Sequence, residues 1–156
     1  MTLKEIQIIL MQEAALSECR RRHFSAAIIG SHLSGYYIIS KGHNQSPFGK
    51  CKKCYRASEE IGQGYHTCPA LHAEEMAILN GLREMSVLSD YSLMAYGEDV
   101  KTEERIVAVN PCKHCVSLIK EVKLKEVIEL NDDGSISKWD GHTWYMAGAG
   151  RPPKIK

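Results

Sequence analysis

The chain has 156 residues, of which 44% are hydrophobic and 25% charged, a balance typical of one globular domain. Its formal net charge of +1 is too small to attract nucleic acid or a membrane surface by long-range electrostatics. The charge therefore counts against both as partners. No apolar run could span a bilayer, and Glu5 and Glu13 interrupt the apolar N-terminal stretch, so no signal peptide is expected. We therefore expect a cytoplasmic, reducing location, where the six cysteines would be metal ligands or buried thiols rather than disulfides.

The first part of the chain predicts a helix followed by a hairpin. Residues 3–22 carry apolar side chains at helical spacing, and we expect this helix to end near Arg20–Arg22, where positive charge suits the helix dipole. Ser25–Gly30 and Gly35–Ser40 are apolar runs typical of strands, separated by a turn. Residues 41–69 have no sustained periodicity, which indicates a long loop. A loop of this length in a compact domain is usually functional or held in place by a ligand such as a metal.

The second part alternates helices and strands. The predicted elements are a helix over 72–83, a strand over 91–96, a turn over 97–104, a strand over 105–109, a helix over 112–122 and a strand over 125–130. Asn131–Gly134 predicts a turn, and the tail over 136–156 has no clear assignment, although Trp139 and Trp144 suggest packing against the body. The alternation predicts a single α/β layered domain.

Four residues near two predicted helix starts offer metal chemistry. His72, Cys112 and Cys115 provide one imidazole and two thiols, a ligand set that suits tetrahedral Zn²⁺ with its fourth position left to water. Zinc lowers the pKa of such a water toward ~7, and Glu74 is placed to carry its protons. This H-x-E…P-C-x-x-C pattern is the signature of zinc nucleobase deaminases, in which zinc-bound hydroxide attacks an amino-bearing ring carbon and ammonia departs.

Each half of the pattern alone has a simpler explanation. A C-x-x-C pair could be a structural metal knuckle or a redox pair, and H-x-E at a helix start could be only a cap. Their joint presence, with Pro111 before the first cysteine, favours a catalytic zinc. Between the thiols, His114 is expected to point away from the metal. Glu75 is expected to be a solvated carboxylate, or one that interacts with the helix dipole, rather than a second base.

The motifs together resemble the cytidine deaminase superfamily and, within it, the deoxycytidylate (dCMP) deaminases. The segments that carry the resemblance, in the family's order, are Ala14–Arg22, Ala26–Ile29, Gly42–Pro47, Cys68–Glu75 and the Pro111–Cys115 motif, which together span about residues 3–130. The resemblance implies a three-layer cytidine deaminase-like fold with a mixed sheet of about five strands flanked by helices. This chain differs from the family at residues 97–105. In the family the strand runs directly into the Pro-Cys motif, whereas here these residues lie between the strand at 91–96 and the motif at Pro111.

The resemblance also implies roles for individual residues. Asn44 would hydrogen-bond the substrate sugar or base, and the Ala73 backbone would contact the pyrimidine. Arg20 and Arg22, from the basic cluster, are candidates for the 5′-phosphate, because guanidinium binds phosphate bidentately. The same residues could instead be a solvated helix end. The family further implies a homo-oligomer, often a hexamer, that dCTP and dTTP sometimes regulate.

A second, structural zinc is also predicted. Cys51, Cys54 and Cys68, with His66 or His43 as a fourth ligand, would make a closed tetrahedral site that pins the long loop. Some dCMP deaminases carry a second zinc in this general region. The alternative is three ordinary reduced thiols, and Cys19 is expected to be a small buried hydrophobe.

Three functions remain open on the sequence alone. The first is hydrolysis of dCMP to dUMP and ammonia, with Glu74 as proton carrier. The second is deamination of another compound on the same scaffold: a modified dCMP, a free nucleoside, guanine, or adenosine in tRNA. The third is a non-catalytic zinc module that binds a nucleotide.

Overall fold

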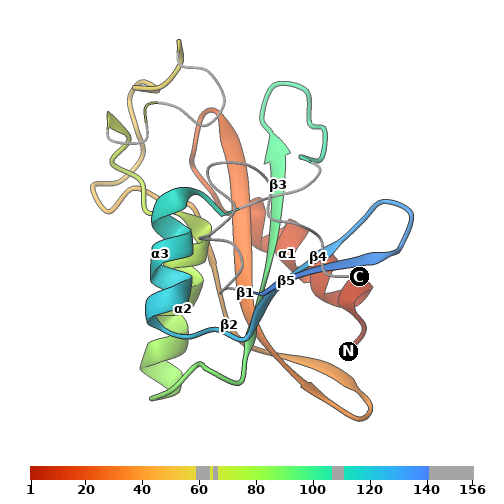
Figure 1. Ribbon diagram of the computed structural model, residues 1–156. Helices are drawn as coiled ribbons and strands as arrows, with labels where there is room; N and C mark the ends of the chain where they lie inside the picture. Colours follow the sequence, from red (N-terminus) through yellow and green to blue (C-terminus); the bar gives the residue numbers. More distant parts are fainter. Residues whose placement is uncertain (59–63, 65–66, 107–110, 141–156) are drawn as a thin grey trace.

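A five-stranded mixed sheet forms the centre of the computed structural model, which describes residues 1–58, 64, 67–106 and 111–140 (Figure 1). In spatial order the strands are β2 (Gly35–His43), β1 (Arg22–His32), β3 (Ser92–Asp99), β4 (Glu126–Leu130) and β5 (Ile136–Asp140). Strands β3 and β4 are parallel, and the other neighbouring pairs are antiparallel, including the predicted β1–β2 hairpin. The predicted α/β class and number of strands are confirmed.

Helices cover both faces of the sheet. Helix α1 (Leu3–Ala14) lies on one face, and α2 (Ala73–Glu84) and α3 (Lys113–Glu121) lie side by side on the other (Figure 1). Alternation along β1 supplies both cores, because Ala26 and Ile28 pack on the α2 and α3 side while Ala27 and Ile29 pack on the α1 side. This confirms the three-layer arrangement. None of the described helices is long and apolar enough to cross a membrane.

The first helix is shorter than the sequence predicts. Helix α1 ends at Ala14 instead of continuing to residue 22. Beyond it the Ser17 hydroxyl is buried and donates to the Asn44 carbonyl oxygen at 2.8 Å, which ties the chain to the end of β2 and turns it away from the helix axis. The prediction that Arg20–Arg22 cap a helix C-terminus is therefore wrong, and Arg22 instead opens β1.

Strand β3 is longer than predicted. It continues to Asp99 because β1 begins at Arg22, and these two residues are paired in the register of the two strands. Gly97 allows the extension, since a Cβ at this position would lie 2.3 Å from a ring atom of Phe24. The predicted turn over 97–104 thus begins later, and Arg105 pairs back with Glu98 as an isolated bridge. Residues 107–110 of the predicted strand over 105–109 lie outside the described residues.

Part of the unassigned tail is ordered as a strand. After the predicted turn at Asn131–Gly134, β5 runs antiparallel to β4 and pairs Trp139 with Val127. The Trp139 side chain is only 3% exposed and belongs to the core beneath α2 and α3, which confirms its expected packing. Trp144 and the rest of 141–156 lie outside the described residues.

Close contact between β2 and α2 sets the position of that helix. A Cβ on Gly42 would lie 2.5 Å from the Cβ of Met76 and 2.8 Å from the backbone nitrogen of Ala77, so only glycine permits this approach. The Ser40 hydroxyl, two residues earlier, donates to the Ala77 carbonyl oxygen at 2.7 Å. The strand therefore holds α2 firmly, and with it the polar residues at the N-terminus of this helix.

Candidate metal centre and active site

Two neighbouring helix N-termini carry the predicted metal ligands. His72 is the N-cap residue of α2, Cys112 is the N-cap residue of α3, and Cys115 lies in the first turn of α3. The N-terminal ends of helices carry partial positive charge, which favours thiolate over thiol. The packing of α2 beside α3 thus joins ligands from two distant segments, as the sequence predicts.

The three donor atoms have a spacing that suits zinc. The sulfur atoms of Cys112 and Cys115 each lie 3.3 Å from Nδ1 of His72, and all three donor atoms lie within 4.8 Å of one another. Tetrahedral Zn–S and Zn–N bonds would place sulfur and nitrogen about 3.5 Å apart. No fourth protein ligand joins this group among the described residues, so the fourth position of a bound ion would be open to solvent.

Hydrogen bonds within the donor group shift the pKa values of all three ligands. A hydrogen bond with Cys115 lowers the pKa of the Cys112 thiol to about 4, and His72 acts in the same direction. The same bond, together with burial, raises the pKa of Cys115, and the hydrogen bond with Cys112 raises the pKa of His72. A cation bound by the two sulfurs and the imidazole would displace protons from the thiols.

Glu74 lies in a pocket that is also lined by two of the three metal ligands. Its side chain is 7% exposed, and it lines a pocket together with His72, Ala73 and Cys112. Burial raises the pKa of the Glu74 carboxyl. A desolvated carboxylate that faces the same small space as an open metal position is able to exchange protons with a ligand bound there.

Glu75, the carboxylate next to Glu74 in the chain, has a structural role. One oxygen of Glu75 accepts a hydrogen bond from the His72 backbone nitrogen at 2.6 Å, and the other lies 2.8 Å from Nε2 of His114. Glu75 thus caps the start of α2 and fixes the backbone of the metal-binding histidine. The His114 side chain is 74% exposed and is not part of the donor group, as expected from the sequence.

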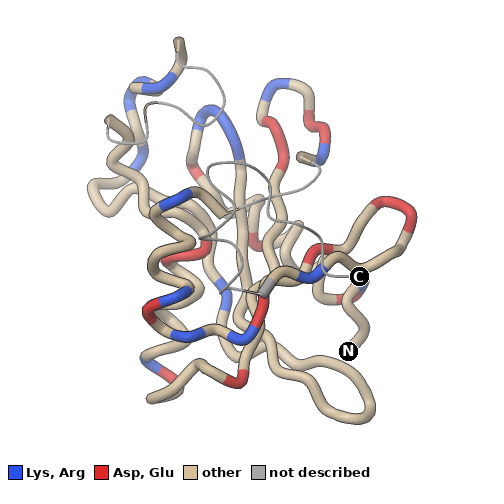
Figure 2. Tube along the Cα trace, in the orientation of Figure 1, with Lys and Arg blue, Asp and Glu red and all other residues tan. Residues whose placement is uncertain are grey.

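Arginines line the pocket beside Glu74. Arg21, Arg22 and Arg56 line it, and Nη1 of Arg21 donates to the Arg56 carbonyl oxygen at 2.5 Å. Arg20 lies in the adjacent pocket instead, where Nε donates to the Cys51 carbonyl oxygen at 2.8 Å. Sequence reasoning missed Arg56, because the loop after β2 has no periodicity that would reveal which of its side chains face inward. Figure 2 shows the basic residues of this loop near those at the start of β1.

The side-chain amide of Asn44 makes three hydrogen bonds within the protein. Oδ1 accepts hydrogen bonds from the Ser17 hydroxyl and the Phe24 backbone nitrogen, each at 2.8 Å, and Nδ2 donates to the Arg22 carbonyl oxygen at 3.0 Å. The residue is 8% exposed and still lines the pocket, as does Ala73. Asn44 therefore fixes the start of β1 beside the site, and one amide hydrogen is left for a ligand.

The cysteines predicted for a second metal lie in the adjacent pocket. Cys51, Cys54 and Cys68 line it, and the structure adds Cys19 to them. The candidate His66 lies outside the described residues. The alternative His43 has its Nδ1 2.7 Å from a buried carboxylate oxygen of Glu13. No three of the four thiols have the close mutual spacing of the first group.

Comparison with known proteins agrees with this geometry. The family described as the cytidine and deoxycytidylate deaminase zinc-binding region matches residues 4–130, so the chain belongs to this family of zinc-dependent deaminases. Among curated proteins the search gave no match. The family and the His72, Cys112 and Cys115 group together identify a zinc-binding, hydrolytic deaminase domain.

Solved structures of low sequence identity share the fold. A cytidine deaminase from Burkholderia pseudomallei has a TM-score of 0.57 at 16% identity, over 90% of this chain and 94% of that one. A dCMP deaminase from the cyanophage S-TIM5, in complex with dCMP and dUMP, has a TM-score of 0.54 at 18% identity, over 83% and 82%. The apo form of the cyanophage protein gives 0.50 at 23% identity, over 83% and 86%. These similarities confirm a cytidine deaminase-like fold.

Proposed function

We propose that this chain hydrolyses dCMP to dUMP and ammonia. The observation that carries the proposal is a single pocket lined by two of the three metal ligands, His72 and Cys112, by the buried Glu74, and by Arg21, Arg22 and Arg56. The first two features supply deamination chemistry. The arginines favour a substrate that carries a phosphate, because guanidinium groups match phosphate oxygens in charge and geometry.

In this proposal Glu74 moves the protons of the reaction. When bound, zinc would supply a water that is acidic enough to react near neutral pH. The Glu74 carboxylate accepts a proton from the attacking water and delivers it to N3 of the cytosine ring. It then passes the second proton to the departing amino nitrogen, so that water and dCMP yield dUMP and ammonia. Its burial suits this role, since bulk solvent does not compete for the protons.

Neighbouring residues would hold the base and the sugar. The remaining amide hydrogen of Asn44 would bond the sugar or base, and the backbone of Ala73, which lines the same pocket, would contact the pyrimidine. Arg21, Arg22 and Arg56 would then receive the 5′-phosphate. The bond from Arg21 to the Arg56 backbone fixes one side of this cluster relative to the other.

A substrate panel with two matched variants tests the proposal. We expect turnover of dCMP at a kcat/KM well above that of deoxycytidine. Arg56→Ala should lower kcat/KM for dCMP about 10- to 100-fold, the loss typical of one charge-assisted hydrogen bond, and leave deoxycytidine nearly unaffected. Arg20→Ala is the control, because that side chain lies outside the pocket. Equal turnover of dCMP and deoxycytidine by the wild type would contradict phosphate recognition.

The same panel covers the other candidate functions. A nucleoside substrate is the second candidate, since a cytidine deaminase shares the fold. Modified dCMP, guanine and tRNA adenosine complete the panel, although the net charge of +1 disfavours tRNA. A chain that binds dCMP without releasing ammonia would be a non-catalytic nucleotide-binding module.

We also propose a homo-oligomer, for which a hexamer is one candidate, in a reducing compartment such as the cytoplasm. Leu79 and Leu82 of α2, with Met85 and Val87 just after it, are 37% to 62% exposed, and a partner subunit would cover them. The thiols of the metal group need a reducing setting to bind an ion. Light scattering measures the mass of the protein in solution, and a monomer would reject the oligomer.

Regulation by dCTP and dTTP stays a prediction, which titration of activity with each nucleotide would check.

A further inference from the structure

We propose that Asp99 positions the guanidinium of Arg22 for the 5′-phosphate of the substrate, a role that rests on the proposed reaction with dCMP. Asp99 ends β3 and Arg22 begins β1, and the two residues are partners in the antiparallel register of these strands. Arg22 lines the substrate pocket, whereas Asp99 does not. Asp99 would therefore act through Arg22 and not on the reacting atoms, which makes it a positioning residue.

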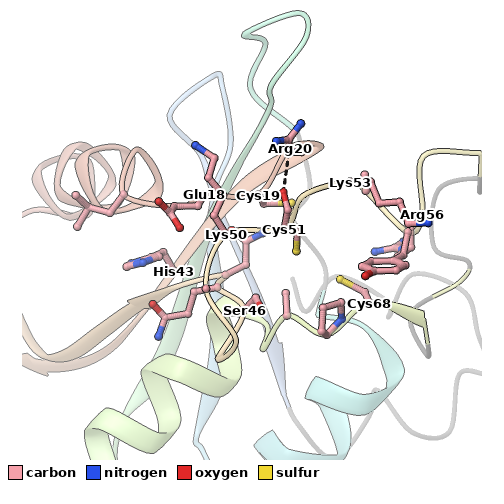
Figure 3. A pocket seen from close by; sticks show the side chains of 18 residues that line it. Glu18, Cys19, Arg20, His43, Ser46, Lys50, Cys51, Lys53, Arg56 and Cys68 are labelled. Carbon is pink, nitrogen blue, oxygen red and sulfur yellow. Dashed lines mark hydrogen bonds between the residues drawn. The ribbon is translucent and has the colours of Figure 1, made fainter.

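The guanidinium of Arg22 contains a buried donor without a partner. Its Nε finds no hydrogen-bond acceptor among the described residues. The arginine two positions earlier is bound to protein instead, because Nε of Arg20 donates to the Cys51 carbonyl oxygen at 2.8 Å (Figure 3). Arg21 likewise donates from Nη1 to the Arg56 carbonyl oxygen. A buried donor that lacks an acceptor is costly, and the oxygens of a bound phosphate would supply one.

The Asp99 carboxylate is fixed so that one oxygen faces Arg22. Oδ1 accepts hydrogen bonds from the backbone nitrogens of Lys101 at 2.9 Å and Thr102 at 3.3 Å. Oδ2 lies 3.8 Å from Nε of Arg22. The two backbone bonds lower the pKa of the Asp99 carboxyl, and Arg22 acts in the same direction, so the group is ionised at neutral pH. A fixed negative charge therefore stands beside the arginine.

Backbone hydrogen bonds hold the segment that carries Asp99 against the start of β1. The Val100 nitrogen donates to the Arg21 carbonyl oxygen at 3.2 Å, and the Ile106 nitrogen donates to the Gly97 carbonyl oxygen at 2.8 Å. Figure 1 shows the turn after β3 beside the beginning of β1. Residues 97–105, where this chain differs from the family pattern, thus contain the group that orients an arginine of the substrate pocket.

The geometry favours orientation of Arg22 over neutralisation of its charge. At 3.8 Å the Asp99 oxygen is beyond hydrogen-bond distance, so it attracts the guanidinium without occupying its donors. The two side chains are 19% and 32% exposed, and ion pairs with such exposure are weak. A phosphate with its several oxygens would therefore take the donors of Arg22, while Asp99 keeps the guanidinium at the edge of the pocket.

Asp99→Asn tests this role with little change in shape. Asparagine keeps an Oδ1 acceptor for the turn but removes the charge beside Arg22. We expect KM for dCMP to rise about two- to fivefold with kcat nearly unchanged, the effect of one partly exposed ion pair. KM for deoxycytidine, which has no phosphate, should stay the same. An unchanged or lower KM for dCMP, or an equal change for both substrates, would overturn the role of Asp99.

Two further variants show whether Asp99 acts through Arg22. Glu98→Gln removes the same charge from the adjacent position, where the carboxylate faces His23, and should leave KM for dCMP unchanged. In an Arg22→Ala background, Asp99→Asn should have no further effect on KM, because its target is already absent. Independent effects that add in the double variant would reject the link between the two residues.

Binding of dUMP separates this role from the proposed reaction. The product carries the phosphate but no amino group, so its dissociation constant is measured without turnover. Asp99→Asn should weaken dUMP binding about two- to fivefold and leave deoxyuridine unaffected. If the wild type releases no ammonia yet the variant weakens dUMP binding, the role of Asp99 stands and the proposed reaction fails. If the wild type deaminates dCMP and the variant binds dUMP as tightly, the reverse holds.

Discussion

Nδ1 of His72 lies 3.3 Å from the sulfur of Cys112, although 40 positions separate the two residues in the chain. Each residue opens a helix, and the two helices are neighbours on one face of the sheet (Figure 1). The contact therefore depends on the packing of α2 against β2 and β1 and of α3 beside α2 over the same core. A change that shifts either helix by a fraction of an ångström would alter the metal centre.

Replacement of Glu74 by glutamine should separate metal binding from catalysis. The amide keeps the shape of the side chain but cannot accept and release a proton near neutral pH, so we expect full zinc content and a fall in kcat of about 100- to 10,000-fold. Glu75→Gln is the matched control, since Glu75 bonds the His72 backbone and His114 instead of lining the pocket. Full activity of Glu74→Gln would remove this residue from the mechanism.

Removal of the metal should abolish activity and lower stability together. A chelator is expected to eliminate ammonia release from dCMP, and added zinc should restore it, because His72, Cys112 and Cys115 supply the donor set of the active-site metal. The melting temperature should also fall, since ligands from two helices lose their common partner. Unchanged turnover in a chain shown by metal analysis to be free of metal would contradict a zinc-dependent reaction.

Stability should fall at acid pH through Glu13. The side chain is 7% exposed; burial acts to raise its pKa, but hydrogen bonds from Lys41 and His43 outweigh this and leave the pKa lowered. A carboxyl with a lowered folded-state pKa contributes stability above its unfolded value of 4.5 and loses it as pH falls through the folded value.

Glu13→Gln isolates this contribution. The variant should be less stable than the wild type at neutral pH by about 1 to 3 kcal/mol. The difference should shrink as pH falls below 4.5, where the unfolded chain takes up the proton, and through the lower pKa of the folded wild type. Urea unfolding at pH 7 and at the lowest pH where the wild type stays folded measures it. A difference that does not change with pH would assign the cost to packing.

Gly42→Ala should destabilise the protein and disturb the site at a distance. The added methyl group would overlap the Met76 Cβ and the Ala77 backbone, so α2 must move away from β2. We expect a loss of about 1 to 3 kcal/mol in the free energy of unfolding, together with a lower affinity for zinc, because His72 begins α2. Wild-type stability and metal affinity in this variant would show that the helix position matters less than the structure suggests.

The sequence predicted the parts that follow short-range rules. The apolar run of β1, the hairpin to β2 and the helix starts at His72 and Cys112 all depend on local pattern and motif chemistry, and the structure confirms them. The three metal ligands follow for the same reason, since residue type and spacing within each motif identify them.

The incorrect predictions concern contacts between distant segments. Helix α1 ends at Ala14 because Ser17 binds Asn44, and β3 reaches Asp99 because β1 begins at Arg22. Arg56 lines the pocket because of the path of an irregular loop. None of these contacts leaves a periodic signal in the sequence. Strand β5 was missed because the tail gave no clear pattern, although it completes the sheet beside β4.

The most direct test of the account is the reaction of the zinc-loaded chain with dCMP, followed by ultraviolet absorbance and by a separate assay for ammonia. We predict that dUMP and ammonia form in equal amounts, and that the rate collapses in Glu74→Gln with its zinc retained. If the wild-type chain binds both zinc and dCMP but releases no ammonia, the account of this pocket as a deaminase active site is contradicted.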